Sequence, residues 1–274
     1  MAINPKEFIH PLDTKALSAL EAIPGLKTLL SAYMKVYDER MTEGLLMSSY
    51  VRLNEHQLPK IYKLFQEVFE TLEIEESMRP QCFLAMDPQP NAYATGNTKT
   101  FIVLHSGIVQ LLNDKELKSV IAHECGHILC KHMLYKTLAR NIASFGLNLF
   151  GLELLVKPII WALLYWDRCS EFSCDRVGAF VMNDADIVRD TMIRLSGGPI
   201  EITKDINVTE YEHQVEELYA RLSQDKYQAL LQLKATLYQN HPFSAIRSKE
   251  VCDWFNSPKT ILPTRGGKDD SLSL

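Results

Sequence analysis

The residues with the clearest chemical potential lie in the segment SVIAHECGHILCKH, residues 119–132, which holds three of the eight histidines of the chain. His123 and His127 are four positions apart and Glu124 directly follows the first, which gives the pattern H-E-x-x-H. On a helix both imidazole rings would lie on one face and could reach one metal ion. Glu124 projects in a neighbouring direction, where it could take a proton from a metal-bound water. The pattern predicts a zinc site, because zinc accepts imidazole nitrogen and carboxylate oxygen and keeps one position for water.

A catalytic zinc site needs a third protein ligand, and the segment RCSEFSCDRVGAF, residues 168–180, offers two carboxylates. Glu171 and Asp175 are four positions apart, again on one face of an expected helix. Glu171 can complete a set of two histidines and one glutamate. Asp175, one turn further, can accept a hydrogen bond from a ligand histidine and fix its tautomer. The alternative is that both are solvated surface acids.

Several motifs together resemble the HtpX-like and CAAX-prenyl-endopeptidase-type zinc metallopeptidases. NAYATG at 91–96, VIAHECGHI at 120–128, SEFSCDRVGA at 170–179 and NHPFSAIR at 240–247 occur in the order of that family. The resemblance covers roughly residues 75–250. It implies a zincin-like domain with one zinc ion per chain.

The resemblance also assigns roles to single residues. His123, His127 and Glu171 would be the metal ligands, Glu124 the general base or acid, and Asp175 the aspartate behind a ligand histidine. The sequence departs from the family in two ways. Cys174 replaces a small residue, and the clear membrane spans of the membrane-embedded relatives are missing.

The late segment around His241 and Arg247 has two interpretations. His241 could donate a hydrogen bond to the oxyanion of a tetrahedral intermediate, with Arg247 holding it or the catalytic helix in place. Alternatively, His241 caps a loop before a helix.

The segment 91–96 could be an ordinary turn or an exposed edge strand above the metal. An edge strand would pair with an extended substrate backbone and make recognition tolerant of sequence. The candidate substrate-binding residues are Asn91, Ala92, Tyr93, Ala94 and Gly96.

The remaining histidines and the cysteines show no ligand spacing. His132 lies five positions after His127, on the wrong face for the same metal, and His10, His56, His105 and His213 are expected to be structural or exposed. Cys125, Cys130, Cys169 and Cys174 form no C-x-x-C pair, so we expect buried packing. Six scattered cysteines favour reduced thiols and a reducing compartment.

The composition is that of an ordinary globular protein, with 46% hydrophobic and 23% charged residues. A net charge of -5 gives no reason to expect nucleic acid as a partner. The N-terminus lacks the basic and apolar regions of a secretory signal.

The hydropathy pattern predicts a mainly helical α+β fold. Helical spacing covers 14–37, 57–73, 167–182, 184–196 and 210–239, and Asn113 with Glu116 predicts a capped start for the motif helix. Short apolar runs at 81–87 and 98–105 predict a small sheet. We divide the chain into N-terminal helices packed on the core (1–74), a metallopeptidase domain (75–256) and a flexible tail (257–274).

The apolar stretch 145–166 raises the question of a membrane span, but Glu153 and Lys157 lie within it. A single span would separate Glu171 from the H-E-x-x-H segment, and two spans do not fit. We expect an apolar helical hairpin that either packs on the protein or dips into a membrane interface, and a cytoplasmic enzyme with some affinity for membranes.

The sequence thus predicts a zinc endopeptidase that cleaves proteins or peptides, with Glu124 as the proton carrier. A non-catalytic zinc-bound scaffold or chaperone-like protein is the alternative, against which the intact Glu124 argues. A hydrolase for another substrate is a third hypothesis, and the edge strand argues for peptides instead.

Overall fold

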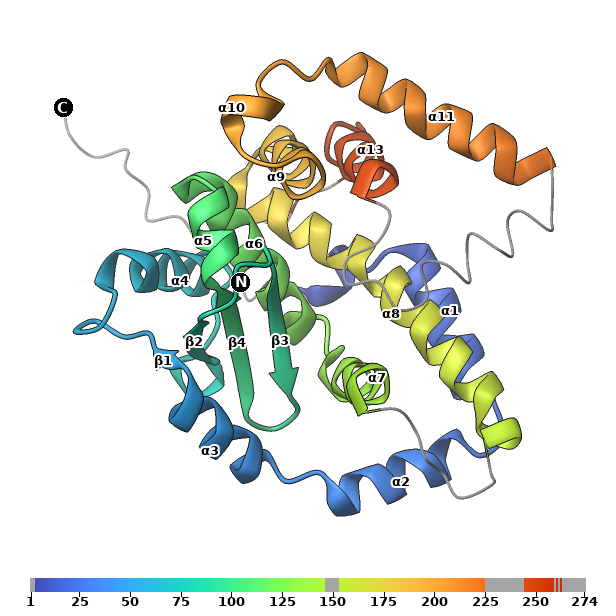
Figure 1. The fold of residues 1–274 in the computed structure, drawn as a ribbon. Helices are drawn as coiled ribbons and strands as arrows, with labels where there is room; N and C mark the ends of the chain where they lie inside the picture. Colours follow the sequence, from blue (N-terminus) through green and yellow to red (C-terminus); the bar gives the residue numbers. More distant parts are fainter. Residues whose placement is uncertain (1–2, 146–152, 225–243, 259, 261, 263–274) are drawn as a thin grey trace.

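The structure, a computed structural model, describes residues 3–145, 153–224, 244–258, 260 and 262 (Figure 1). Within these residues the chain is predominantly helical and carries one small mixed sheet. The predicted α+β class is therefore confirmed.

The N-terminal helices surround the core. Their bounds are Pro11–Glu21 for α1, Leu26–Val36 for α2, Glu39–Ser49 for α3 and Pro59–Thr71 for α4, with short 3-10 turns at Pro5–Glu7 and Glu76–Met78. The helical pattern over 14–37 forms two helices. Pro24 and Gly25 separate them, and Gly25 has a φ of 91°, which a glycine adopts readily.

The sheet has four strands in the order β1-β2-β4-β3. The strands are β1 Val51–Arg52, β2 Gln81–Ala85, β3 Ala92–Gly96 and β4 Thr100–His105. β2 runs parallel to β4, and β3 runs antiparallel to it. β3 is therefore an edge strand, as expected for 91–96, and it lies beside α7 (Figure 1). The expectation that this strand is exposed was wrong, because α6 and α7 pack on it and Ala92, Ala94 and Gly96 are buried.

The helices after the sheet begin with α5 Ser106–Leu111, α6 Asp114–Leu129 and α7 Met133–Phe145. The predicted cap of α6 is present. The Asn113 side chain accepts from the Glu116 N–H at 3.0 Å, and Glu116 accepts from the Asn113 N–H at 3.0 Å. Both bonds satisfy amide groups that would otherwise lack partners at the start of the helix.

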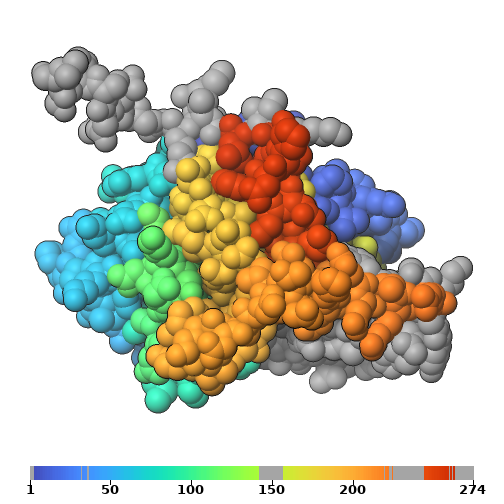
Figure 2. Space-filling view, turned by 90° about the horizontal axis from the view of Figure 1, so that it is seen from above, coloured from blue at the N-terminus to red at the C-terminus, as the bar shows by residue number. Residues whose placement is uncertain are grey.

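The C-terminal helices are α8 Glu153–Met182, α9 Ala185–Gly197, α10 Ile200–Thr203, α11 Val208–Gln224 and α13 Ser244–Phe255. Figure 2 shows α13 beside α9 on one face, with α10 and α11 next to them. The pattern at 167–182 belongs to a longer helix that begins at Glu153. The part of the predicted helix 210–239 after Gln224 lies outside the described residues.

The predicted apolar hairpin is described in part. Residues 153–166 form the first half of α8, which packs against α7 and has α1 alongside it (Figure 1). The connection at 146–152 lies outside the described residues. Among the described residues, none of the helices combines the length and the apolar character that a membrane crossing requires.

One hydrophobic core joins the N-terminal part of the chain to the motif helix. Phe8, Phe65 and Phe69 are almost fully buried and belong to the same cluster as Ile121 and Ala122 of α6. Phe8 and helix α4 thus pack against the motif helix, while the division of the chain into N-terminal helices (1–74) and a peptidase domain (75–256) stays a prediction.

The packing of α6 on α8 depends on a close approach at Gly126. A Cβ atom at this position would lie 3.1 Å from the Cα of Cys174 and 3.2 Å from the Cβ of Val177. These distances are tighter than ordinary contacts, so only a residue without a side chain fits well. Gly126 lies within the H-E-x-x-H pattern, and the crossing brings that pattern against the segment that holds Glu171.

We expect Gly126→Leu to destabilise the fold by about 1–3 kcal/mol, because the added side chain overpacks the crossing. Gly44 in α3 is the matched control, since no neighbouring atom lies within 4 Å of a Cβ built there. Gly44→Leu should leave the stability unchanged or raise it, because leucine favours a helix over glycine. Urea denaturation of both variants measures the difference. Equal effects of the two substitutions would contradict the importance of the crossing.

Candidate metal centre

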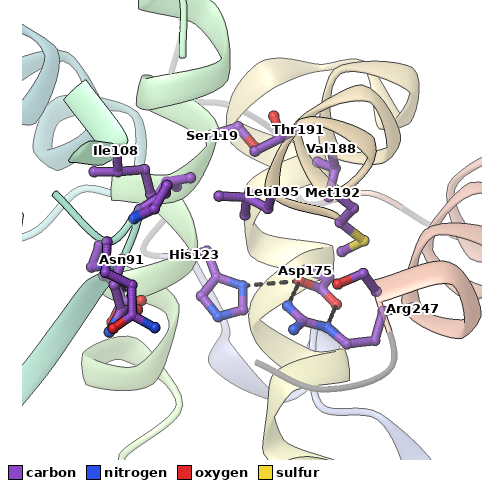
Figure 3. Close-up of a pocket in the computed structure, with 17 residues that line it drawn as sticks. Asn91, Ile108, Ser119, His123, Asp175, Val188, Thr191, Met192, Leu195 and Arg247 are labelled. Carbon is purple, nitrogen blue, oxygen red and sulfur yellow. Dashed lines mark hydrogen bonds and ion pairs between the residues drawn. The ribbon is translucent and has the colours of Figure 1, made fainter. Parts of the chain in front are cut away.

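The last turns of α6 carry the H-E-x-x-H residues into the interior of the molecule. His123 is 8% exposed and His127 is fully buried. Figure 3 shows His123 between Asn91, at the start of β3, and Asp175 on α8. The site is therefore built from an edge strand and two crossing helices.

Asp175 and Arg247 form a buried pair behind His123. Asp175 Oδ1 lies 2.9 Å from His123 Nδ1. Arg247, on α13, donates from Nε to Oδ2 at 2.7 Å and from Nη2 to Oδ1 at 2.6 Å (Figure 3). Burial opposes ionisation of Asp175, but the charge and the hydrogen bonds of Arg247 outweigh it and lower the pKa of the carboxyl group. With Nδ1 turned to this carboxylate, Nε2 of His123 points into the site.

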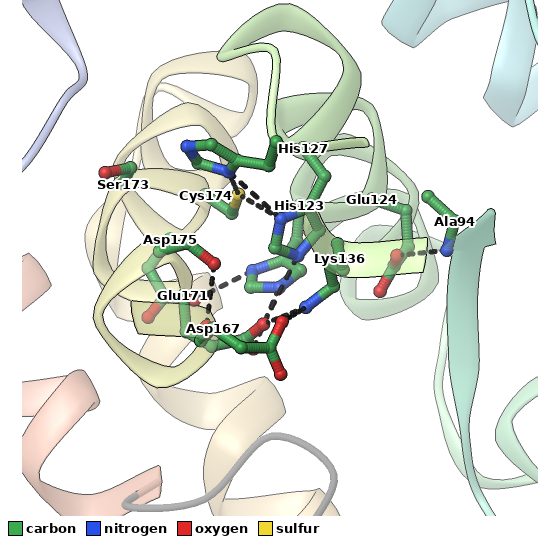
Figure 4. Close-up of polar contacts among 12 residues, drawn as sticks. Ala94, His123, Glu124, His127, Lys136, Asp167, Glu171, Ser173, Cys174 and Asp175 are labelled. Carbon is green, nitrogen blue, oxygen red and sulfur yellow. Dashed lines mark hydrogen bonds and ion pairs between the residues drawn. The ribbon is translucent and has the colours of Figure 1, made fainter. Parts of the chain in front are cut away.

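Glu171 lies between the two histidines (Figure 4). Its Oε2 is 3.3 Å from His123 Nε2, and its Oε1 is 3.3 Å from His127 Nε2. A zinc ion with bonds of about 2.0–2.1 Å in tetrahedral geometry separates its ligand atoms by about 3.3 Å. The distance from each Nε2 atom to an oxygen of Glu171 is therefore the distance that two ligands of one zinc ion would have.

The protonation of the two rings differs. Burial and the charge of Lys136 lower the pKa of His127 well below its usual value, so this ring is neutral. Its Nε2 is buried, and the described residue that approaches it is Glu171, at 3.3 Å. Burial also opposes a charge on His123, but Glu171 and Asp175 outweigh it and raise its pKa to about 9. The carboxylates thus favour a positive charge at this point, which a metal cation would supply.

A second histidine and an aspartate lie behind His127. His132 Nδ1 is 3.2 Å from His127 Nδ1, and His132 Nε2 is 3.0 Å from Oδ2 of Asp13. Asp13 belongs to α1, is almost fully buried, and also accepts hydrogen bonds from Ser173 and Trp166. One arrangement of protons satisfies the hydrogen bonds among His127, His132 and Asp13. In it, Nδ1 of His127 donates to Nδ1 of His132, and Nε2 of His132 donates to the carboxylate of Asp13.

The spacing of His132 predicts that it lies on the wrong face to bind the metal, and it does not predict the contact of His132 with His127 Nδ1. The helix ends just before it, because Lys131 adopts a left-handed conformation with a φ of 61°. The His132 N–H then bonds the His127 carbonyl at 2.9 Å, which turns the ring back toward the site. The short spacing from His127 was the only signal in the sequence.

Cys174 is an alternative candidate for the third metal ligand beside His123 and His127. Atoms of His123, His127 and Cys174 that could bind a metal lie within 4.8 Å of one another. The sulfur, however, is 3.1 Å from Nδ1 of His127, on the opposite side of the ring from Nε2. Burial raises the pKa of the thiol well above its usual value, which disfavours the thiolate needed for metal binding.

Glu124 is buried and held by the edge strand. Its Oε2 accepts a hydrogen bond from the Ala94 N–H at 2.7 Å (Figure 4). At the C-terminal end of β3, both backbone groups of Gly96 are already hydrogen-bonded to a side chain. The Gly96 N–H donates to Thr137 Oγ1 at 3.1 Å, and the Thr137 hydroxyl donates to the Gly96 carbonyl at 2.8 Å. The predicted edge strand thus lies directly beside Glu124, while its contact with substrate stays a prediction.

Lys136, on α7, is a further residue that sequence reasoning missed. Its Nζ donates to Glu171 Oε1 at 2.6 Å and to Asp167 Oδ1 at 3.2 Å, and the side chain is 6% exposed. Arg247 Nη1 approaches the other oxygen of Glu171 at 3.2 Å. Two buried cations therefore fix the carboxylate between the histidines. His241 lies outside the described residues.

Comparison with known proteins shows to which family the chain belongs. The family model of peptidase family M48 matches residues 55–254, more than half of the chain. The chain belongs to peptidase family M48. Because the family is a family of peptidases, the chain is a peptidase. One relative is itself called a metallopeptidase, which is consistent with a metal ion in the site.

Two relatives are similar to the chain, and the first of them covers more of it than the family model does. A plastoglobule-localized metallopeptidase 48 of Arabidopsis thaliana is 29% identical over 93% of this chain and 74% of its own length. A protease HtpX homolog of Gemmatimonas aurantiaca is 25% identical over 66% of this chain and 74% of its own length. The resemblance to HtpX-like peptidases is therefore confirmed. No solved structure matches the chain.

We expect His132→Ala to lower the zinc affinity of this M48 peptidase by roughly 10–100-fold, because His127 loses the partner that fixes its tautomer. Cys174→Ser is the matched control, since Cys174 contacts the same Nδ1 atom but is not expected to bind the metal. Competition with a coloured zinc chelator measures both affinities. A larger loss in Cys174→Ser than in His132→Ala would instead make the sulfur a ligand.

Proposed function

We propose that the chain is a zinc metalloendopeptidase that hydrolyses internal peptide bonds of proteins, with one zinc ion held by His123, His127 and Glu171. The observation that carries the proposal is the 3.3 Å separation of each Nε2 atom from an oxygen of Glu171. A bound zinc ion would polarise the scissile carbonyl and lower the pKa of a water molecule toward about 7. The protein residues then have to position the substrate and move a proton.

Glu124 is the proposed proton carrier. The N–H of Ala94, the middle residue of β3, donates a hydrogen bond to its carboxylate and fixes it in place. The carboxylate takes a proton from the attacking water and later gives it to the nitrogen of the leaving amine, as general base and then general acid. Asp175 and Arg247 hold His123 in the tautomer that a ligand needs. His241 stays the proposed donor to the oxyanion.

The edge strand supports peptides as the substrate class. Ala92, Tyr93, Ala94 and Gly96 belong to the last strand of the sheet and Asn91 directly precedes it, and an extended chain can add to an edge strand by backbone hydrogen bonds. Such binding uses the backbone of the substrate more than its side chains, so it would allow a protease to cleave many different proteins.

We expect Glu124→Gln to slow hydrolysis of casein by about 10²–10⁴-fold while zinc binding is unchanged, because the amide cannot accept the proton and Glu124 is not a ligand. Metal content and cleavage are measured on the same zinc-loaded preparations. Equal cleavage by both proteins would refute the role of Glu124. Absence of cleavage in both, with zinc bound, would favour the non-catalytic scaffold.

We also propose peripheral contact with membranes through the first half of α8. Trp161 and Tyr165 lie one turn apart on this helix and are 49% and 44% exposed. Aromatic rings with polar groups favour the boundary between lipid and water. The cytoplasmic location stays a prediction.

We expect the double variant Trp161→Ser, Tyr165→Ser to bind phosphatidylcholine vesicles at least about tenfold more weakly, because two apolar side chains no longer enter the interface. Met86→Ser is the control, since Met86 is 91% exposed and lies far from α8 in the sequence. Vesicle flotation compares the three proteins. Unchanged binding of the double variant would remove α8 from the contact.

A further inference from the structure

Arg140, on α7, is a cation near the candidate metal centre that the proposed function does not use. It follows Lys136 by four positions, so both side chains leave the same face of the helix. Lys136 donates a hydrogen bond to Glu171, and the charges of Glu124 and Glu171 act on Arg140 as well. The face of α7 that fixes the carboxylate between the histidines therefore presents a second positive charge to the site.

The edge strand holds the guanidinium of Arg140 in place. Its Cζ atom lies 3.9 Å over the centre of the Tyr93 ring, which is a cation–π contact. Tyr93 directly precedes Ala94, whose N–H donates to Glu124. A cavity of about 250 Å³ between α6 and α9 includes Glu124 in its lining, but neither Tyr93 nor Arg140. Arg140 is thus close to the proposed proton carrier and separate from that cavity.

The positive charge of Arg140 has no carboxylate partner in the described part of the chain. None of these residues accepts a hydrogen bond from Arg140 or forms an ion pair with it, and its Nε atom is buried. Burial lowers the pKa of Arg140, because the charges of nearby carboxylates offset it only in part. Lys136 and Arg247 are buried too, but their carboxylate partners outweigh burial and raise both pKa values. A cation that is withdrawn from water without a partner is unfavourable, so an anion beside Arg140 would be stabilising.

The donors of Arg140 suit a carboxylate in particular. The contact with Tyr93 supplies no acceptor oxygen, and the side chain is only partly buried, so a ligand can approach it. The N–H groups of a guanidinium form a planar fork that matches the two oxygen atoms of a carboxylate. In surroundings poor in water such a bond is stronger than on an open surface. The peptide groups that fit are the side chains of aspartate and glutamate and the free C-terminus.

We infer that Arg140 binds a carboxylate of the substrate, which comes either from an aspartate or glutamate side chain or from the C-terminus of a peptide. The inference rests on the proposed peptidase function and adds a substrate preference to it. Arg140 determines specificity in this inference and takes no part in the proton transfer. Hydrogen bonds between charged groups contribute more than those between neutral groups. We therefore expect kcat/KM to be at least about tenfold higher for a peptide with the carboxylate than for the matching amide.

The test compares pairs of peptides that differ by one carboxylate, with the zinc-loaded full chain as the enzyme. In the first series, aspartate or glutamate is placed at each position of a short neutral peptide in turn, and its partner carries asparagine or glutamine there. In the second series, the same peptide ends in a free carboxylate or in an amide. The ratio of kcat/KM within a pair is measured, because a general loss of activity does not change it. The series that shows the effect identifies the source of the carboxylate.

Arg140→Gln is the informative variant, because glutamine is polar and flexible but carries no charge. It should bring the ratio of acid to amide peptide close to one. Arg140→Lys keeps the charge without the planar fork and should keep part of the ratio. Arg221→Gln is the matched control, since its side chain is 74% exposed on α11 and pairs with Glu217. It changes the net charge by the same amount and should leave the ratio unchanged.

The outcomes separate recognition by Arg140 from a structural role. A preference for the acid peptide of at least about tenfold, lost in Arg140→Gln and kept in Arg221→Gln, supports the inference. Equal cleavage of acid and amide peptides by wild type overturns it. If Arg140→Gln slows both members of every pair to the same extent, Arg140 only packs on Tyr93, and the inference is wrong as well.

A binding measurement decides the matter if wild type cleaves no peptide, which would refute the proposed function instead. The same pairs of peptides, labelled with a fluorophore, are then titrated with the zinc-loaded protein, and fluorescence anisotropy gives each Kd. Binding of the acid peptide that is at least about tenfold tighter, and that is lost in Arg140→Gln, supports the carboxylate site. Equal affinities overturn it.

Discussion

The structure depends on the burial of three carboxylates where α6 crosses α8. Glu124, Glu171 and Asp175 are each at most 2% exposed, and a buried carboxylate is costly unless cations and hydrogen-bond donors surround it. Arg247 and Lys136 supply the cations, and a backbone N–H supplies the donor for Glu124. A divalent metal ion would add the remaining positive charge. The need to compensate these charges explains why distant parts of the chain meet at one point.

Each surrounding element brings one partner. α13 contributes Arg247, α7 contributes Lys136, and α1 contributes Asp13 through His132. α1 lies outside the region matched by the family model, yet it ends the row of hydrogen bonds that begins at a candidate ligand. The N-terminal helices therefore do more than cover the core, because they complete the electrostatic surroundings of His127.

The sequence allowed the inner part of the site to be predicted, because that part is local. His123, Glu124 and His127 follow from the period of one helix, and Glu171 with Asp175 from the period of another. The outer part depends on tertiary packing. His132 changes direction at the end of α6, and Lys136 reaches Glu171 across helices, which no spacing encodes. The fold class was readable from hydropathy, whereas the break at Pro24 and the early start of α8 were not recognised.

The two ends of the edge strand differ, and the N–H groups along its outer side are already hydrogen-bonded. At Gly96 the strand is closed by Thr137, one residue after Lys136, so α7 both fixes Glu171 and blocks pairing there. At Asn91 the strand borders a cavity whose apolar wall comes from α9. Along the side of β3 that faces away from β4, the N–H groups of Ala92, Ala94 and Gly96 donate to Asn91, Glu124 and Thr137. These bonds tie the strand to α6 through Glu124 and to α7 through Thr137, so β3 is part of the polar surroundings that position Glu124 beside the candidate ligands.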